Sequence, residues 1–211
     1  PAETALQTMD YTESPKKQPQ KSTIIPFRDL GILGQGGMGV VHRVEDPKLF
    51  RPIAMKALKI SNEQEREVFF LEALISSHLR HSGIIPLHDF GMLNDGRSFF
   101  TMQEIQGKTL TEIIRSLHNS SKKDGWGITK EGWTFRKVIA VLHRVCEIVA
   151  YGHAQGVVHR DLKPSNIMVG DFGEVWVVDW GIAKLMEGSA IAAQILPYVE
   201  ERHIEMQNKS I

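Results

Sequence analysis

The segment HRDLKPSN at residues 159–166 constrains this chain more than any other feature of its sequence. The apolar residues GVV lead into it, and its spacing places Asp161 five residues before Asn166 on a tight loop. Within that loop, Asp161 can orient a hydroxyl group and accept its proton. Lys163 can neutralise charge on a transferring phosphoryl group, and Asn166 can ligate magnesium. The segment therefore predicts a phosphoryl-transfer site, whereas the alternative, a charged surface turn, would not require all of these positions.

Two Asp-x-Gly triplets follow this segment, Asp171-Phe172-Gly173 and Asp179-Trp180-Gly181. The geometry of a hairpin distinguishes between them as candidate metal ligands. Residues 167–169 (IMV) and 175–178 (VWVV) are apolar and flank a turn, so they predict two paired strands. A strand advances about 3.3 Å per residue, which puts Asp171 in the turn, roughly 15 Å from Asn166. Asp179 follows the returning strand and ends beside the start of the first. We therefore expect Asp179 to share a metal site with Asn166, and Asp171 to be an ordinary turn residue.

A glycine-rich stretch, LGQGGMGVV at residues 33–41, places Gly34, Gly36 and Gly39 in a G-x-G-x-x-G pattern. Because glycine has no Cβ, its backbone amide can approach phosphate oxygens closely. In a dinucleotide-binding fold this pattern lies between a strand and a helix. Here the segments VVHRVE and PIAMKALKI follow as further strands, so the pattern favours a flap over nucleotide phosphates.

Lys56 stands in the second of these strands, and a helix predicted at residues 62–79 offers it a partner. A lysine held by a glutamate can direct its ammonium group at the α- and β-phosphates of a nucleotide. Glu72 follows the apolar residues FFL on the face expected to be buried. Glu65 and Glu67 are alternatives, but acidic residues near a helix start are commonly solvated there. We expect Glu72 to pair with Lys56.

Other segments predict short elements around these motifs. We expect strands at residues 27–33, 40–45, 52–60, 87–93 and 98–105, a short helix at 109–117, a surface loop at 118–132 and a long helix at 135–155. The face of the long helix expected to be buried comprises Val138, Leu142, Val145, Cys146 and Val149, with Cys146, the single cysteine, as a structural thiol. Residues 1–26 are polar and lack periodicity, so they are expected to form a disordered arm.

Together, the glycine-rich loop, the strand lysine, the helix glutamate, HRDLKPSN and the metal-binding aspartate resemble the eukaryotic-like Ser/Thr protein kinases, most of all their bacterial members. The resemblance covers residues 27–185. It implies a two-lobed α+β fold, with an antiparallel sheet and one helix at 27–105 and an incomplete helical lobe at 106–211. It also implies ATP and Mg²⁺ as cofactors and a protein Ser or Thr as substrate.

The resemblance assigns roles to individual positions. The implied catalytic residues are Lys56, Glu72, Asp161 and Lys163, and the implied metal ligands are Asn166 and Asp179. The implied nucleotide-binding residues are Gly34, Gly36, Gly39, Val41, Ala54, Lys56, Met102, Gln103 and Ile105. Among these, Met102 would be the gatekeeper, and residues 103–105 would be the hinge that holds adenine.

The sequence departs from the kinase pattern near its end. Trp180 stands where the family has phenylalanine, and the small Ser76, one helical turn after Glu72, leaves room for its indole. After residue 188 no activation-segment anchor and no further lobe helices follow, so we expect a C-terminally truncated kinase whose last residues form an amphipathic helix or a frayed tail. Without those helices the long helix would keep an apolar face in water, which favours self-association.

Three functions are compatible with these motifs. The first is a Ser/Thr protein kinase, the second a nucleotide-binding pseudokinase or inactive kinase fragment that acts as an interaction module, and the third a small-molecule phosphotransferase. We rank them in that order, because the third class usually lacks the full HRDLKP segment. Lys plus Arg and Asp plus Glu both total 25, so the overall charge indicates neither a nucleic acid nor an anionic membrane as partner. The absence of a long apolar segment predicts a cytoplasmic protein.

Overall fold

A five-stranded antiparallel sheet forms one side of the molecule in this computed structural model, which describes residues 27–37, 39–59, 62–121 and 127–209, with side chains as far as residue 201. The expected disordered arm lies outside these ranges. The strands of the sheet are β1 (Arg28–Gln35), β2 (Gly39–Glu45), β3 (Pro52–Leu58), β4 (Leu87–Met92) and β5 (Ser98–Met102). They are ordered β1-β2-β3-β5-β4, so β3, which carries Lys56, is the central strand.

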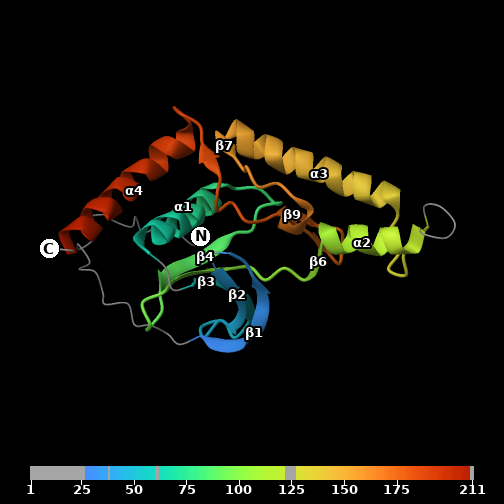
Figure 1. Cartoon of the computed structure of the whole chain (residues 1–211), viewed down its shortest axis with the longest axis horizontal. Helices are drawn as coiled ribbons and strands as arrows, with labels where there is room; N and C mark the ends of the chain where they lie inside the picture. The colour runs from blue at the N-terminus through green and yellow to red at the C-terminus, as the bar shows by residue number, and fades with distance from the viewer. Residues whose placement is uncertain (1–26, 38, 60–61, 122–126, 210–211) are drawn as a thin grey trace, which may run out of the picture.

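The remaining regular structure consists of helices and short strands. The helices are α1 (Glu63–His78), α2 (Leu110–Ser121), α3 (Phe135–Ala154), α4 (Ala190–Lys209) and the 3₁₀ helix η1 (Pro164–Asn166). The short strands are β6 (Gly107–Thr109), β7 (Val157–Val158), β8 (Ile167–Gly170), β9 (Val175–Val177) and β10 (Lys184–Leu185). Strands β6, β8 and β9 form one small sheet, and β7 pairs with β10. Figure 1 shows α1 beside the large sheet, whereas α2 lies next to β6 and α3 runs past β9.

Helix α1 is fixed by its cap and by an aromatic cluster. The side chain of Asn62 accepts a hydrogen bond from the backbone N–H of Glu65 at 2.9 Å, which satisfies one of the free donors at the helix start. Further along, Phe69 is fully buried, and its ring lies 4.9 Å from that of Phe100 on β5. These contacts attach α1 to the sheet and turn Glu72, which is also buried, toward β3.

Helix α3 buries a different face from the one expected. The buried residues are Val138, Val141, Val145, Ile148 and Gly152. Leu142 is 41% exposed and Cys146 is exposed, so the predictions of a buried Leu142 and of a buried thiol at Cys146 were wrong. The reason is a rotation of the helix about its axis, because β9 and β7, against which α3 packs, lie on the side of Val141 and Ile148.

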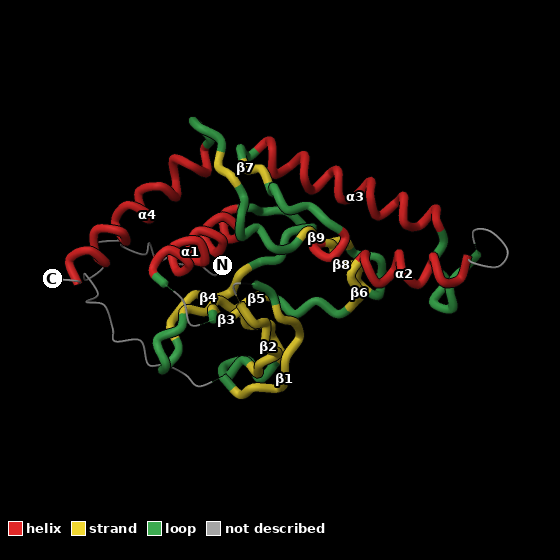
Figure 2. Tube along the Cα trace, viewed as in Figure 1, coloured by secondary structure: helices red, strands yellow, loops and turns green. Residues whose placement is uncertain are grey.

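Helix α4 leaves the region of α3 and packs against α1. The Ser189 hydroxyl accepts a hydrogen bond from the Ala192 N–H at 3.1 Å and so caps the first turn. A Cβ on Gly156, the second residue after α3, would lie 2.1 Å from Cβ of Ser189, so the two backbones meet closely here. Ile191 and Ile195 are buried in the same apolar cluster as residues of α1. A helix and a frayed tail were the two alternatives expected for this segment, and the helix is confirmed. Figure 2 shows it alongside α1.

The predicted fold class, α+β with an antiparallel sheet and a helical part, is confirmed. Several element boundaries differ from those expected. Helix α2 extends to Ser121, which includes residues expected to form the surface loop. Strand β6 and the pair β7–β10 were not predicted, since segments of two or three residues show no periodicity. Within the described residues, no helix combines the length and the apolar character needed to cross a lipid bilayer.

Candidate active site

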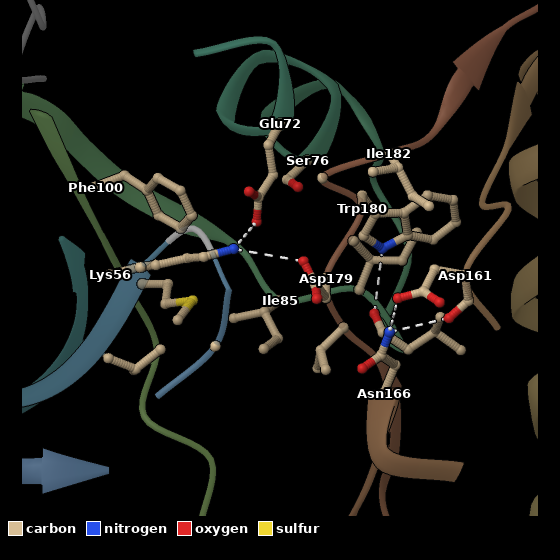
Figure 3. A pocket seen from close by; sticks show the side chains of 18 of the residues that line it. Lys56, Glu72, Ser76, Ile85, Phe100, Asp161, Asn166, Asp179, Trp180 and Ile182 are labelled. Atoms are coloured by element: carbon tan, nitrogen blue, oxygen red, sulfur yellow. Dashed lines mark hydrogen bonds and ion pairs between the residues drawn. The ribbon is translucent and has the colours of Figure 1, made fainter. Parts of the chain in front are cut away.

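A cavity of about 400 Å³ lies between the large sheet and the loop that joins β7 to η1. Most of the residues predicted from the sequence line it (Figure 3). These are Gly36, Gly39, Val41, Lys56, Glu72, Met102, Asp161, Lys163, Asn166 and Asp179. They come from β2, β3, α1, β5, the loop before η1 and the residues after β9. The fold therefore gathers side chains from positions 36 to 179 around one space.

Four predicted nucleotide-binding residues do not line this cavity: Gly34, Ala54, Gln103 and Ile105. Ala54 is 4% exposed in the body of the sheet, opposite Met102 on β5. Gln103 instead lines a second cavity on the other side of the chain between β5 and β6. Sequence reasoning in turn missed apolar residues that line the space: Ile84, Ile85, Leu87, Phe100, Val177 and Val178. The only available signal was that each lies in an apolar run.

Lys56 lies between two carboxylates. Its Nζ is 2.5 Å from Oε1 of Glu72 and 3.4 Å from Oδ1 of Asp179 (Figure 3). The structure thus pairs Lys56 with Glu72, the helix glutamate selected from the sequence. Glu72 is 4% exposed, and its other carboxylate oxygen has no hydrogen-bond partner among the described residues. Burial raises the pKa of this carboxyl; the nearby Lys56 ammonium opposes the rise, and Asp179 adds to it.

The loop of HRDLKPSN is held by hydrogen bonds to His159. This ring is 2% exposed and bonds to the Val178 carbonyl at 3.1 Å and to the Asp161 backbone N–H at 3.2 Å. Because the N–H of Asp161 donates to Nδ1, the proton of the neutral ring is on Nε2, which donates to Val178. Burial lowers the pKa of His159, which keeps the ring neutral. His159 therefore anchors the loop.

Asp161, Lys163 and Asn166 form a compact group in this loop. Lys163 Nζ lies 2.7 Å from Oδ2 of Asp161, and the Asn166 amide donates to the same oxygen at 3.0 Å. The hydrogen bond from Lys163 is the main cause of the lowered pKa of Asp161, and the same contact raises the pKa of Lys163. At neutral pH Asp161 is thus an ionised acceptor. The amide nitrogen of Asn166 is occupied, which leaves its oxygen available to a cation.

The hairpin predicted from residues 167–169 and 175–178 is confirmed. Ile167 pairs with Val177 and Val169 with Val175, and the Val178 N–H donates to the Asn166 carbonyl at 2.9 Å. The returning strand therefore brings Asp179 back to the level of Asn166 and into the cavity. Asp171 lies in the turn at the other end. The neighbouring Phe172 is 95% exposed, so this turn faces water.

Trp180 is buried immediately beside Asp179. Its indole N–H donates to the Val177 carbonyl at 3.2 Å, and its ring lies 4.6 Å from the ring of His159. Space for the indole comes from α3, because a Cβ on Gly152 would lie 3.1 Å from Cη2 of Trp180. Ser76 lines the same cavity as Trp180. Gly152 could not be singled out from the sequence, because a glycine within a helix carries no sign of which distant residue packs against it.

The glycine-rich turn between β1 and β2 is folded back on itself and onto β3. The Gly36 N–H donates to the Gly39 carbonyl at 2.9 Å, and Lys59 Nζ donates to the Gly36 carbonyl at 2.8 Å. A Cβ on Gly39 would lie 2.9 Å from the Ala57 carbonyl oxygen, so only glycine allows β2 to approach β3 here. Gly36, Gly37 and Gly39 therefore border the cavity with backbone alone.

The donor set suits a magnesium nucleotide. Mg²⁺ is commonly held by one or two protein oxygens, with phosphates and waters completing its shell. Asp179 and the Asn166 oxygen provide such a pair, and the described residues contain no group of three or more His, Cys, Asp or Glu that would hold an ion by itself. Lys56 adds a positive charge at the same place, which suits phosphate oxygens.

Comparisons with known proteins agree with this arrangement. A family model described as the protein kinase domain matches residues 27–197. Serine/threonine-protein kinase PknD of Protochlamydia amoebophila is 36% identical over 182 residues, which cover 82% of this chain and 18% of that protein. The protein of the same name from Chlamydia felis is 37% identical over 160 residues, 73% of this chain and 16% of that protein. The chain thus spans less than a fifth of the length of these curated relatives.

Proposed function

The chain belongs to the protein kinase family, and on that basis we propose that it transfers the γ-phosphoryl group of Mg-ATP to a Ser or Thr hydroxyl of a protein. The observation that supports this most strongly is the convergence of Lys56, Asp161 and Asp179 on one cavity. These residues are remote in sequence, and each has the chemistry that phosphoryl transfer requires. The names of the two relatives, both serine/threonine-protein kinases, are consistent with the Ser/Thr class.

Mg-ATP, when bound, supplies the phosphoryl group and the cation that neutralises its charge. Asp179 and the Asn166 oxygen would hold that cation. Lys56, kept in place by Glu72, would bind phosphate oxygens, and the turn at Gly36 and Gly39 would cover them with backbone N–H groups. Met102, with the backbone of residues 103–105, would border the adenine.

Asp161 is the group that would orient the protein hydroxyl and accept its proton. It is ionised at neutral pH because Lys163 lowers its pKa, so an acceptor is present without any change of state. Lys163, 2.7 Å away, can turn from Asp161 toward a phosphoryl oxygen as negative charge develops there. The two residues thus supply an acceptor and a cation from one short loop.

The first test is a thermal melt with and without Mg-ATP, followed by transfer of radiolabelled γ-phosphate to a Ser/Thr-containing protein. Ligand at about 100 times its dissociation constant should stabilise the chain by about 2.7 kcal/mol. Lys56→Ala should lose that shift, whereas Asp161→Asn should keep the shift and lose transfer. Binding without transfer in the unmodified chain would refute the kinase proposal in favour of a nucleotide-binding interaction module.

The assignment of the metal ligand has its own test. Asp179→Asn should abolish magnesium-dependent transfer, while Asp171→Asn, in the exposed turn, should leave it within about twofold, because surface substitutions away from a site change little. Equal losses in both variants would contradict the assignment of Asp179.

We also propose a boundary and an assembly for the chain. The large sheet with α1 would form one lobe, residues 27–105, and residues 106–211 would form part of the second. An apolar strip on α3, comprising Phe135, Ile139, Leu142 and Cys146, is exposed and follows helical spacing, which supports self-association. Ile139→Lys should shift sedimentation toward the monomer. Because ATP is an intracellular nucleotide, we place the reaction in the cytoplasm.

A further inference from the structure

A second cavity, about 520 Å³ in volume, lies behind the candidate active site. It is bounded by the end of α1, by the segment that joins α1 to β4, and by Gln103 and Trp176. Its volume is within the range of pockets that hold small molecules. None of the roles proposed above uses this space.

Among the residues that line this cavity, Arg80 alone carries a permanent charge. Arg80 contributes a guanidinium group that has no ion-pair partner within the described part of the chain. The hydroxyls of Ser76 and Ser82 make no hydrogen bond to other described residues. No lining residue is an aspartate or a glutamate, in contrast to the active-site cavity, which contains Glu72 and two aspartates. The charge here therefore favours an anion.

These donors stand on a segment that is held firmly. The Arg80 N–H donates to the Tyr151 hydroxyl at 2.9 Å, and the Gly83 N–H donates to Nδ1 of His81 at 3.0 Å. The proton of a neutral His81 ring is therefore on Nε2, which adds another donor. A Cβ on Gly83 would lie 2.2 Å from Cδ1 of Ile148, so this backbone sits directly on α3. The backbone that carries these donors is thus fixed before any ligand binds, which lowers the entropic cost of binding.

The remaining walls are apolar. They are formed by Leu79, Ile84, Pro86, Leu87 and Trp176. A small inorganic anion would leave these walls in contact with water, whereas an aliphatic or aromatic body would cover them. We propose that this cavity binds a small amphiphilic organic anion, with its carboxylate or phosphate at Arg80 and its apolar body against Trp176.

The two cavities share a wall, which gives such a ligand a route to the active site. Ser76, Ile84 and Leu87 line both spaces. Ser76 is one turn after Glu72 on α1, and Figure 3 shows both side chains pointing toward the same region. A ligand that contacts Ser76 would therefore act on the helix that holds Lys56. Because coupling between sites is reciprocal, its binding should change the affinity for Mg-ATP, and Mg-ATP should change its affinity by the same factor.

Isothermal titration with three probes of equal chain length tests the proposal. The probes are octyl phosphate, octanoate and 1-octanol, used below the concentrations at which they form micelles. We expect octyl phosphate or octanoate to bind with 1:1 stoichiometry and 1-octanol to bind at least tenfold more weakly. Comparison of the two anions distinguishes a phosphate from a carboxylate ligand.

Variants of two exposed arginines locate the site. Arg80→Gln should weaken anion binding about tenfold or more, since hydrogen bonds to a charged group are lost. Arg136→Gln, an exposed position on α3, is the matched control and should change binding less than twofold. Equal binding of 1-octanol and the anions, no binding of either anion, or equal effects of the two variants would each overturn the proposal. A dissociation constant for Mg-ATP that is unchanged at saturating anion would overturn the coupling.

Discussion

The contact between Trp180 and Gly152 gives a prediction that can be worked out from the structure. In Gly152→Ala, the new Cβ would lie 3.1 Å from Cη2 of Trp180, 3.4 Å from its Cζ3 and 3.3 Å from the Val157 carbonyl oxygen. Replacing glycine by alanine within a helix stabilises it by about 1 kcal/mol. Overpacking of a buried site costs about 1–3 kcal/mol. We therefore expect a net loss of about 1 kcal/mol in the free energy of unfolding.

In a chain that already carries Trp180→Phe, Gly152→Ala should increase the free energy of unfolding instead of lowering it. Phenylalanine lacks the outer atoms of the indole, so most of the crowding at residue 152 is removed while the helix gain remains. Alone, Trp180→Phe loses the hydrogen bond to the Val177 carbonyl, at a cost of about 1 kcal/mol. The double variant should then be more stable than the sum of the single changes predicts, with a coupling energy of about 1–2 kcal/mol.

Urea unfolding followed by far-ultraviolet circular dichroism measures these energies, provided that the slopes agree among the variants. The control is Ala150→Gly, which changes helix propensity at an exposed position of the same helix and should combine additively with Trp180→Phe. Additivity of Gly152→Ala and Trp180→Phe within about 0.3 kcal/mol would refute the reasoning, because independent sites behave in that way.

Two further predictions concern stability. Ile195→Ala on α4 removes a fully buried side chain and should cost about 2–5 kcal/mol in urea unfolding; Leu196→Ala, at a position 46% exposed, should cost less than about 0.5 kcal/mol. Because burial lowers the pKa of His159 from 6.5, its contribution is complete above pH 6.5 and is lost as pH falls through the folded-state pKa. Urea midpoints between pH 5 and pH 7.5 should therefore depend less on pH in His159→Gln than in the exposed control His143→Gln. Identical slopes of midpoint against pH in the two variants would contradict this. The slope that remains in His159→Gln includes the contribution of His88, whose pKa is also lowered by burial.

How much of the site could be predicted depended on the kind of geometry involved. The pairing of Lys56 with Glu72 and the separation of Asp179 from Asp171 follow from strand rise and helix periodicity, which are local. The orientation of α3 could not be predicted in this way. Apolar residues, Cys146 among them, lie on more than one face of this helix, and only the positions of β9 and β7 decide which face is buried.

Close approaches between distant segments were the second limit. Gly152 matters because Trp180, many positions later, fills the space above it, and no spacing rule connects the two. The second cavity was missed for a similar reason. Arg80 and Trp176 are each unremarkable in the sequence, and only the fold brings them to one space.

The path of α4 has a mechanical consequence. The chain crosses from the large sheet to the helical part through residues 103–106, and it returns when α4, attached near Gly156, packs against α1. Helix α4 therefore adds a further link between the two sides of the cavity, besides this connection and the contacts of Arg80 and Gly83 with α3. Any opening of this cavity must either carry α4 along with α1 or expose Ile191 and Ile195, at about 1.5–3 kcal/mol for each side chain. The free energy of such an opening is thus set in part by a helix that forms no wall of the cavity.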